Sequence, residues 1–549
     1  MKYKFFGSII IVGLAGAMLA TSCSKKIDDA YLNPNAAVVE PVESLLPSVI
    51  SSFSAFYTAN GSGYGLENDG ILLGRYIQFW GSQTNAENYG QMGGTVGSDN
   101  TGSIWAAVYF GQGQNVNKII EWGSQQQKWD YVGVAWAVRA WGWLELTEQY
   151  SDGILKQAFN TNLQQFQYDT QPEFFDSCRA ICFRALSFLN RTDGAVSATN
   201  LALGDAYFYK GDVNKWKKFV YGILARSYDD LSSKSIYASN GYADSAIKYA
   251  NLAMLTNGDN ATCKFQGGTT SGVNNYYGPF RGNMGTIRQG QYIADLMSGN
   301  NAGAFAGVAD PRAPYMLREN TNGTYKGFTV WLGSGGLVAN DYPQNFWGNA
   351  TASSTTAPTV NNSRYIFQDT AQYPMMTASE MNFILAESYL RKGNAGAALT
   401  AYTNAISLNF DMLTSVYTQN IPAAGVITPT SKANYLANPA VVPTNASQLT
   451  MTEIMLQKYI SQYGWGVQRT WVDMRKYHYT DIDPATGGQV YANFTPPSGI
   501  NLISTNNGKL VYRCRPRFNS EYLYDVAELT RIGAENLDYV TYECWFSQK

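Results

Sequence analysis

The chain has 549 residues, with 39 basic and 41 acidic side chains and a formal net charge of -2. A balance this close to neutral offers no broad basic field for a phosphate backbone, so we expect no nucleic-acid partner. Charged residues make up only 15% of the chain, whereas Tyr alone occurs 39 times. Such a composition favours neutral, polyhydroxylated or amide-bearing ligands over phosphates.

The N-terminus has the pattern of an export signal. Lys2 and Lys4 precede a mostly apolar stretch at 5–19, which is shorter than the roughly 20 residues of a membrane-spanning helix. The sequence Ala-Thr-Ser-Cys then ends at Cys23, as in bacterial lipoproteins whose cysteine is acylated after cleavage. We therefore predict lipidation of Cys23, and acyl chains there would anchor the protein to a membrane. An ordinary signal peptide with an incidental cysteine is the alternative.

These features divide the chain into three parts. We predict a signal peptide over 1–22 and a short polar tether over 23–44, in which Pro34 and Pro41 favour an extended chain. The remaining residues, 45–549, are predicted to form a single mainly α-helical domain, because helical periods recur along them between polar loops.

The first predicted helices lie in the N-terminal half. "YVGVAWAVRAWGWLELTEQY" and "PEFFDSCRAICFRALSFLN" both have helical periodicity, and their tryptophans are expected to be packing residues. A second pair follows Asp212, which we predict to be an N-cap, and it ends with "GYADSAIKYANLAML". Both segments of each pair place apolar residues on one face, as packed helices require.

The strongest repeat signal is "ASEMNFILAESYLRKGNAGAALTAYTNAISLNF" at 378–410. Small and aromatic residues line two helices separated at Gly393, which is the pattern of a tetratricopeptide-type helix pair. Further on, Thr450 and Glu453 form a predicted capping box ahead of "IMLQKYISQY".

Long polar segments separate the helices at 267–285, 331–363, 421–446 and 496–508. They are too rich in Gly, Asn and Pro to be predicted as helices, and loops of this length are often functional. Two of them, "NNYYGPFRGNMG" and "WLGSGGLVANDYPQNFWG", contain aromatic residues that we expect to be exposed.

Signals for catalysis or for a metal are weak. His478 is the only histidine, no P-loop motif occurs, and a pair of carboxylates for glycoside hydrolysis leaves no spacing rule in a sequence. Cys178 and Cys182 share one predicted helix face, where packing is a simpler explanation than a metal pair because no further Cys or His lies nearby. We predict neither a metal nor a cofactor.

Several motifs together resemble one family. "YLNPN" after the lipoprotein signal, "GDVNKWKKFVYGILAR", "VADPRAPYMLREN", the helix pair at 378–410 and the closing "PRFNSEYLYDVAEL" are similar to SusD/RagB-type nutrient-binding outer-membrane lipoproteins of Bacteroidota. "QKYISQYGWGVQRTWVDMRKYHY" resembles the group 2 branch of SusD-like proteins. Two features depart from the family pattern: "YSDGILKQAFN" matches loosely, and Lys25 and Lys26 dilute the acidic residues that favour surface export.

The resemblance implies a fold and a function. Four tetratricopeptide-like helix pairs would form a scaffold beside a loop-rich ligand-binding region. The protein would be anchored in the outer membrane, facing the cell exterior, and would act as a hinged lid on a SusC-like TonB-dependent transporter. The expected ligand is an oligosaccharide, with an oligopeptide as the alternative.

By order along the chain, the resemblance also implies a ligand site. It would draw on the segment after the first helix and on the two aromatic loops, and its candidate residues are Arg75, Trp80, Gln83, Asn85, Tyr276, Tyr277, Trp331 and Trp347. Aromatic rings would stack on the ligand while amides form hydrogen bonds. Local packing of each loop residue is the alternative interpretation. A surface glycoside hydrolase and a purely structural helical-repeat adaptor are the two other classes of function that the sequence leaves open.

Overall fold

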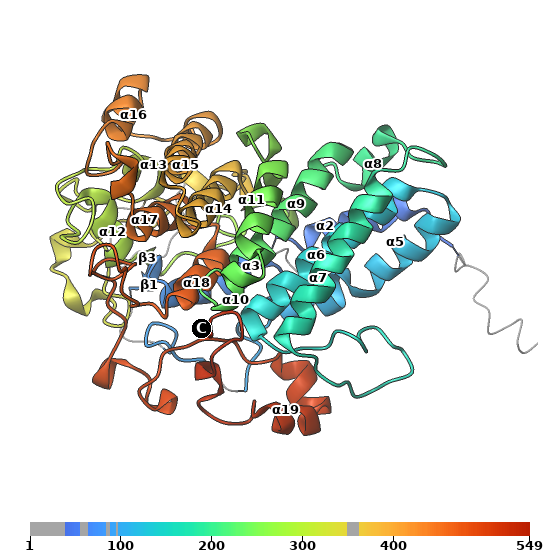
Figure 1. The fold of residues 1–549 in the computed structure, drawn as a ribbon. Coiled ribbons are helices and arrows are strands. Elements are labelled where there is room, and N and C mark those ends of the chain that lie inside the picture. The colour runs from blue at the N-terminus through green and yellow to red at the C-terminus, as the bar shows by residue number, and fades with distance from the viewer. Residues whose placement is uncertain (1–38, 55–63, 84–87, 95–96, 349–361) are drawn as a thin grey trace, which may run out of the picture.

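A computed structural model describes residues 39–54, 64–83, 88–94, 97–348 and 362–549 of the chain, shown in Figure 1. The predicted signal peptide, Cys23 and Asn85 lie outside these residues.

The described residues are mainly helical. The α-helices are α2 (Leu46–Ser51), α3 (Leu66–Tyr76), α4 (Ser103–Ala106), α5 (Gly113–Gln125), α6 (Trp129–Tyr150), α7 (Gln171–Leu189), α8 (Ala198–Gly204), α9 (Val213–Asp229), α10 (Ile236–Ser239), α11 (Tyr242–Leu252), α12 (Gln291–Ser298), α13 (Ala313–Met316), α14 (Ala378–Arg391), α15 (Ala395–Val416), α16 (Pro429–Leu436), α17 (Met451–Ser461), α18 (Val467–Lys476) and α19 (Val526–Ile532). Two short π-helical segments are η2 (Ala107–Gln112) and η12 (Phe518–Tyr522). No helix among the described residues is long and apolar enough to cross a membrane.

Helices α6 and α7 form the first predicted pair, and they pack along one another. Thr170 and Glu173 form a capping box at the start of α7, which satisfies backbone donors that the helix itself leaves unpaired. Cys178 and Cys182 are buried free cysteines, and the Cys178 thiol donates to the carbonyl of Ala140 on α6. The prediction that this pair of cysteines packs between helices is confirmed.

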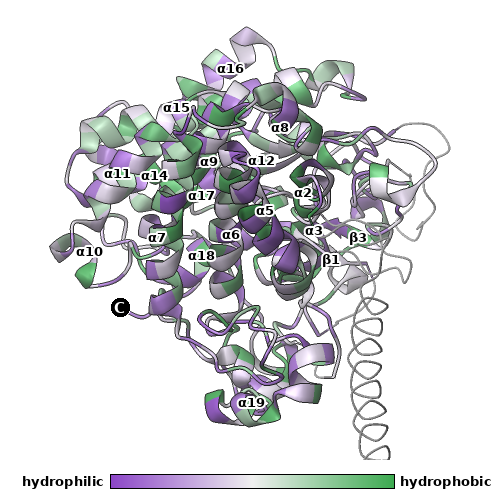
Figure 2. Cartoon of the chain, turned by 90° about the vertical axis from the view of Figure 1, so that its right-hand side faces the viewer, coloured by the Kyte–Doolittle hydropathy of each residue, from purple (hydrophilic) through white to green (hydrophobic). Residues whose placement is uncertain are grey.

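The next two predicted pairs are α9 with α11 and α14 with α15. The Asp212 carboxylate accepts from two backbone N–H groups of α9 and is its N-cap, as predicted. Gly393 separates α14 from α15 with φ +73°, a left-handed conformation that glycine adopts at no steric cost. Figure 1 shows these helices beside α6 and α7 as one scaffold. Figure 2 shows hydrophobic and hydrophilic residues interleaved along most of them, as in amphipathic helices.

Helices α17 and α18 complete the scaffold. The predicted capping box of Thr450 and Glu453 is present at the start of α17. Helix α18 contacts α3, which comes from the beginning of the domain, so the chain closes on itself.

The loop-rich region holds two small antiparallel sheets. β1 (Trp80–Ser82) pairs with β3 (Ile287–Gln289), with Trp80 opposite Gln289, and β2 (Ala261–Cys263) pairs with β4 (Tyr373–Met376). The first sheet joins the segment after α3 to the loop that contains Tyr276 and Tyr277.

The structure corrects two predictions about the long loops. Residues 421–446 contain α16, which has Thr428 as N-cap and Pro429 in its first turn, so local capping outweighs the polar composition. The aromatic loop residues are also mostly buried: Tyr276, Tyr277, Phe346 and Trp347 are each at most 6% exposed. Trp331 and Tyr342 are half-buried, and Phe280 is 48% exposed. The buried rings pack against one another and against the core, which composition could not reveal.

Candidate functional site

The candidate ligand site is a cleft of about 360 Å³ between α3, the start of α4 and the loop that follows Tyr276. Amide and hydroxyl groups dominate its lining, together with the apolar sides of Ile71, Leu72 and Ala106. The polar residues that line it are Tyr64, Asn68, Asp99, Asn100, Thr101, Ser103, Tyr276, Asn283 and Arg517. Apolar walls with a few placed polar groups are typical of sites for small ligands.

Asn68 is the centre of the polar wall. Its amide N–H donates to the Ser103 hydroxyl, and its amide oxygen accepts from the Tyr276 hydroxyl. Asn283 donates to the backbone carbonyl of Tyr276 at 3.0 Å. Burial raises the pKa of Tyr276 to about 12, so this hydroxyl stays neutral at physiological pH. The wall therefore presents fixed neutral donors and acceptors.

Asp69 supports this wall from inside the protein. Its carboxylate accepts from the backbone N–H groups of Ser103 and Ile104, at 3.1 and 3.0 Å, and from the Gln149 amide at 2.7 Å. Burial raises the pKa of Asp69 despite these bonds. Because Asp69 holds the start of α4, it positions Ser103 opposite Asn68.

The rim of the cleft carries its charged groups. Arg517 pairs with Asp99 at 2.6 Å, and Asn519 donates to the same carboxylate from its backbone and its side chain. Asp99 is the only carboxylate among the described residues that line the cleft. Glycoside hydrolysis needs two carboxylates flanking the bond, and the described lining holds one.

Three of the predicted ligand residues lie in the core. Trp80, Tyr277 and Trp347 are fully buried. The rings of Trp80 and Tyr277 meet edge to face with centroids 5.8 Å apart, and the Trp347 indole donates to the Tyr277 carbonyl at 2.9 Å. The structure thus brings these three residues together, but their rings offer no face to a ligand in this conformation.

Two glycines of α3 explain why Trp80 and Tyr277 can be buried against this helix. A Cβ at Gly74 would lie 2.4 Å from the Trp80 ring, and one at Gly70 would lie 2.8 Å from the Tyr277 hydroxyl. Because these glycines are four residues apart, they form one flat helix face that receives both rings. The four-residue spacing of Gly70 and Gly74 is therefore a sequence signal for packing of aromatic rings against α3.

The other predicted residues are separated. Arg75 is 6% exposed at the end of α3. Gln83 is half-buried and accepts from Arg288 at 2.9 Å, which ties its side chain to β3. Trp331 is half-buried in a different loop. Of the seven predicted residues that the structure describes, only Tyr276 lines the cleft. Asn68, Asn100 and Asn283 also line it and were not predicted from the sequence.

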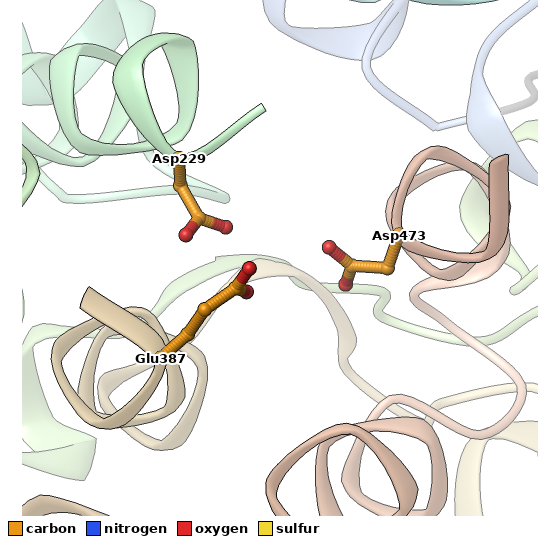
Figure 3. Close-up of side chains that lie close together, drawn as sticks. All are labelled: Asp229, Glu387 and Asp473. Carbon is orange, nitrogen blue, oxygen red and sulfur yellow. The ribbon is translucent and has the colours of Figure 1, made fainter. Parts of the chain in front are cut away.

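A second group of titratable residues lies deep between the helices. Figure 3 shows Asp229 of α9, Glu387 of α14 and Asp473 of α18 with their carboxylates turned toward one another. The Lys476 ammonium lies 3.3, 3.2 and 3.0 Å from these three groups in turn, and Lys458 lies 2.9 Å from Asp473. The two ammonium groups take the place that a metal cation would need, so we interpret the cluster as structural.

Further buried ion pairs join the neighbouring helices. Arg469 of α18 pairs with Asp230 and with Glu148 of α6, and Arg226 of α9 pairs with Glu380 of α14 at 2.7 Å. Burial alone would lower the pKa of Lys476, but the charges of Asp229 and Glu387 outweigh it and raise that pKa well above its usual value. The charged positions of the "QKYISQYGWGVQRTWVDMRKYHY" motif therefore serve the scaffold.

Comparison with known proteins identifies the family. Residues 35–499 match the model of the second SusD-like family, which is described as "Starch-binding associating with outer membrane". The chain belongs to this SusD-like family. No curated protein matches the chain.

Solved structures share the fold over nearly the whole SusD-like chain. A SusD homolog from Bacteroides fragilis has a TM-score of 0.68 at 17% identity, covering 92% of this chain and 100% of its own. A SusD/RagB family protein from Bacteroides thetaiotaomicron has a TM-score of 0.62 at 20% identity, covering 93% and 99%. A chitin-binding protein has a TM-score of 0.64 at 17% identity, covering 93% and 100%. The mainly α-helical SusD-like fold predicted from the sequence is confirmed.

Proposed function

We propose that this SusD-like protein is a cell-surface lipoprotein that captures an oligosaccharide in the cleft around Asn68 and delivers it to a SusC-like TonB-dependent transporter as a hinged lid. Cys23 would carry the lipid anchor in the outer membrane, with the domain facing the cell exterior. The protein is proposed to bind without chemistry.

The observation that carries this proposal is the lining of the cleft. Asn68, Asn283 and Tyr276 form a connected wall of neutral donors and acceptors, while Tyr64 adds an aromatic side chain. Sugar hydroxyls pair well with such groups, and the family description and the chitin-binding structural neighbour both concern glycans. Peptide amides could use the same groups, so oligopeptides are the competing ligand class.

A binding screen separates these possibilities. Purified protein would be tested by calorimetry against glycan and peptide libraries, and the best ligand would then be titrated into variants. Losing one neutral hydrogen bond weakens binding by about 1 kcal/mol, so Asn100→Ala and Asn283→Ala should each weaken it about fivefold. Tyr276→Ala should weaken it at least tenfold if that ring is a hot spot.

Tyr524→Ala is the matched control for this screen, because Tyr524 is 68% exposed and does not line the cleft. Unchanged affinity in all three cleft variants, with the fold retained, would refute the site. Steady release of reducing sugar from the bound glycan would instead support a hydrolase.

The partner is tested by extraction. Mild detergent should recover this protein together with a large β-barrel protein from outer membranes. Repeated recovery of the chain alone would argue for an independent binding protein.

A further inference from the structure

One surface outside the cleft combines exposed apolar side chains with lysines that have no carboxylate partner among the described residues. We name it the α8 face and define it as Leu203, Tyr207, Lys210, Lys215 and Lys264. Leu203 is 65% exposed and Tyr207 is 47% exposed. An apolar cavity of about 210 Å³ opens beside them between α2, α8 and the loop after β2.

The lysines of the α8 face act on one another through their charges. Burial, and then the charges of Lys210 and Lys215, lower the pKa of Lys264. The Lys264 ammonium donates to the Phe208 carbonyl at 3.3 Å, and its backbone N–H donates to the Tyr207 carbonyl. Lys218 nearby pairs with Asp259 at 2.6 Å, but within the described ranges no carboxylate lies within 4.0 Å of the three ammonium groups of the α8 face.

The nearest acidic groups are used elsewhere. Asp205 is fully buried, and its carboxylate accepts from the Gly211 backbone and the Trp216 indole. Asp212 is the N-cap of α9. The α8 face therefore presents positive charge around an apolar centre.

This face also lies where the described chain begins. Asn200, one turn before Leu203 on α8, donates to Glu43 at 2.6 Å, and Val42 is fully buried beside it. Only 16 residue steps separate Cys23 from Val39, and even a fully extended chain of that length spans at most about 55 Å. Figure 2 views the molecule from the end where α2, α5 and α8 lie.

We propose that the α8 face docks on a membrane surface that carries phosphate groups. Leu203 and Tyr207 would enter the headgroup layer, where tyrosine is favoured, and the three lysines would pair with lipid phosphates. The proposal rests on the proposed anchor at Cys23, because the tether is what holds this end of the protein near lipid. Docking would then orient the domain, which an anchor alone leaves free to rotate.

The test uses the acylated full-length protein in vesicles. Tyr207→Cys would carry a polarity-sensitive fluorophore, since the five described cysteines are buried. Vesicles with phosphatidylglycerol should shift its emission to the blue, whereas phosphatidylcholine alone should not. Tyr524→Cys, labelled in the same way, is the control and should show no shift in either.

Charge reversal tests the lysines. Lys210→Glu with Lys264→Glu should weaken docking by about fivefold or more for each lysine, because one lysine near an anionic lipid surface raises the affinity about fivefold. Lys248→Glu with Lys509→Glu makes the same charge change at two exposed lysines outside the face and should leave the shift intact.

The possible failures are distinct. Protein that does not sediment with vesicles at all would refute the anchor. Protein that sediments but shows no emission shift at position 207 would overturn docking and leave the anchor intact. The same conclusion would follow if the shift were equal in both kinds of vesicle and unchanged by Lys210→Glu with Lys264→Glu. A shift that appears only when a transporter is added would assign the face to a protein partner and would also overturn the proposal.

Discussion

Lys476 holds its charge at a position with no solvent exposure, between Asp229, Glu387 and Asp473. Removing one partner from a buried ionic cluster is costly because the remaining charges lose both water and their counter-ion. The cluster is thus a place where single residues decide stability.

We expect Lys476→Met to lower the free energy of unfolding by about 3–5 kcal/mol. Denaturant unfolding monitored by circular dichroism would measure it. Lys509→Met, at an exposed lysine, is the control and should change stability by less than about 0.5 kcal/mol. A loss below about 1 kcal/mol at Lys476 would show that the cluster is not held by this ammonium group.

Asp229 makes stability depend on pH. Burial, and then the charge of Glu387, raises its pKa from 3.8 to about 6. Because the pKa is raised in the folded state, this carboxyl contributes stability at low pH that is lost as the pH rises through about 6.

Asp229→Asn removes that dependence. Between about pH 4.5 and pH 6.5, the wild-type protein should therefore lose on the order of 2 kcal/mol of stability relative to the variant. Unfolding curves of both proteins at the two pH values would measure the difference. Asp411→Asn, at an exposed aspartate that pairs with Lys432, serves as the comparison. If the stability of the wild type relative to Asp229→Asn stayed constant or rose between the two pH values, the raised pKa would be contradicted.

At the scale of elements, α3 and β1 depend on each other. The Trp80 indole donates to the Ile71 carbonyl at 2.9 Å, and the Trp80 ring covers Gly74. The same helix also contributes Asn68 and Leu72 to the lining of the cleft. The packing of Trp80 against α3 therefore helps to fix the position of Asn68 in the polar wall of the cleft.

Gly74→Ala should destabilise the protein by about 1–3 kcal/mol, because the added methyl group would overlap the buried Trp80 ring. Thermal and denaturant unfolding would measure the loss. Gly396→Ala in α15 is the matched control: its Cβ would meet nothing within 4 Å, so helix propensity should leave stability equal or slightly higher. Equal effects of the two substitutions would mean that the Trp80 contact does not constrain α3.

At the scale of the whole molecule, buried charges join helices that are far apart in the sequence. Arg469 of α18, for example, pairs with Glu148 of α6 and with Asp230, which follows α9. Such pairs align the scaffold, and the loop-rich region with the cleft is built against it.

The anchor is tested on the whole protein. Cys23→Ser should abolish lipoprotein processing, because the acylated sulfur is removed, and the protein should be lost from the outer membrane. Palmitate labelling and membrane fractionation would measure this. Cys178→Ser, at a buried cysteine in α7, is the control and should still label. A Cys23→Ser protein that labels and fractionates like the wild type would refute the anchor.

The sequence by itself determined the helix pairs and the family. Periodicity, the N-cap at Asp212, the break at Gly393 and the capping box at Thr450 act over three or four residues, so they can be recognised without a fold. The family motifs and their order can likewise be read directly along the chain.

Only the tertiary structure decided which residues line the cleft and which are buried. Trp80, Tyr277 and Trp347 looked like loop aromatics, yet contacts with segments up to hundreds of residues away bury them. Tyr276 differs from Tyr277 by one position and lines the cleft, because neighbouring residues of an irregular loop can point to opposite sides. Burial depends on what packs against a segment, and that information is not local.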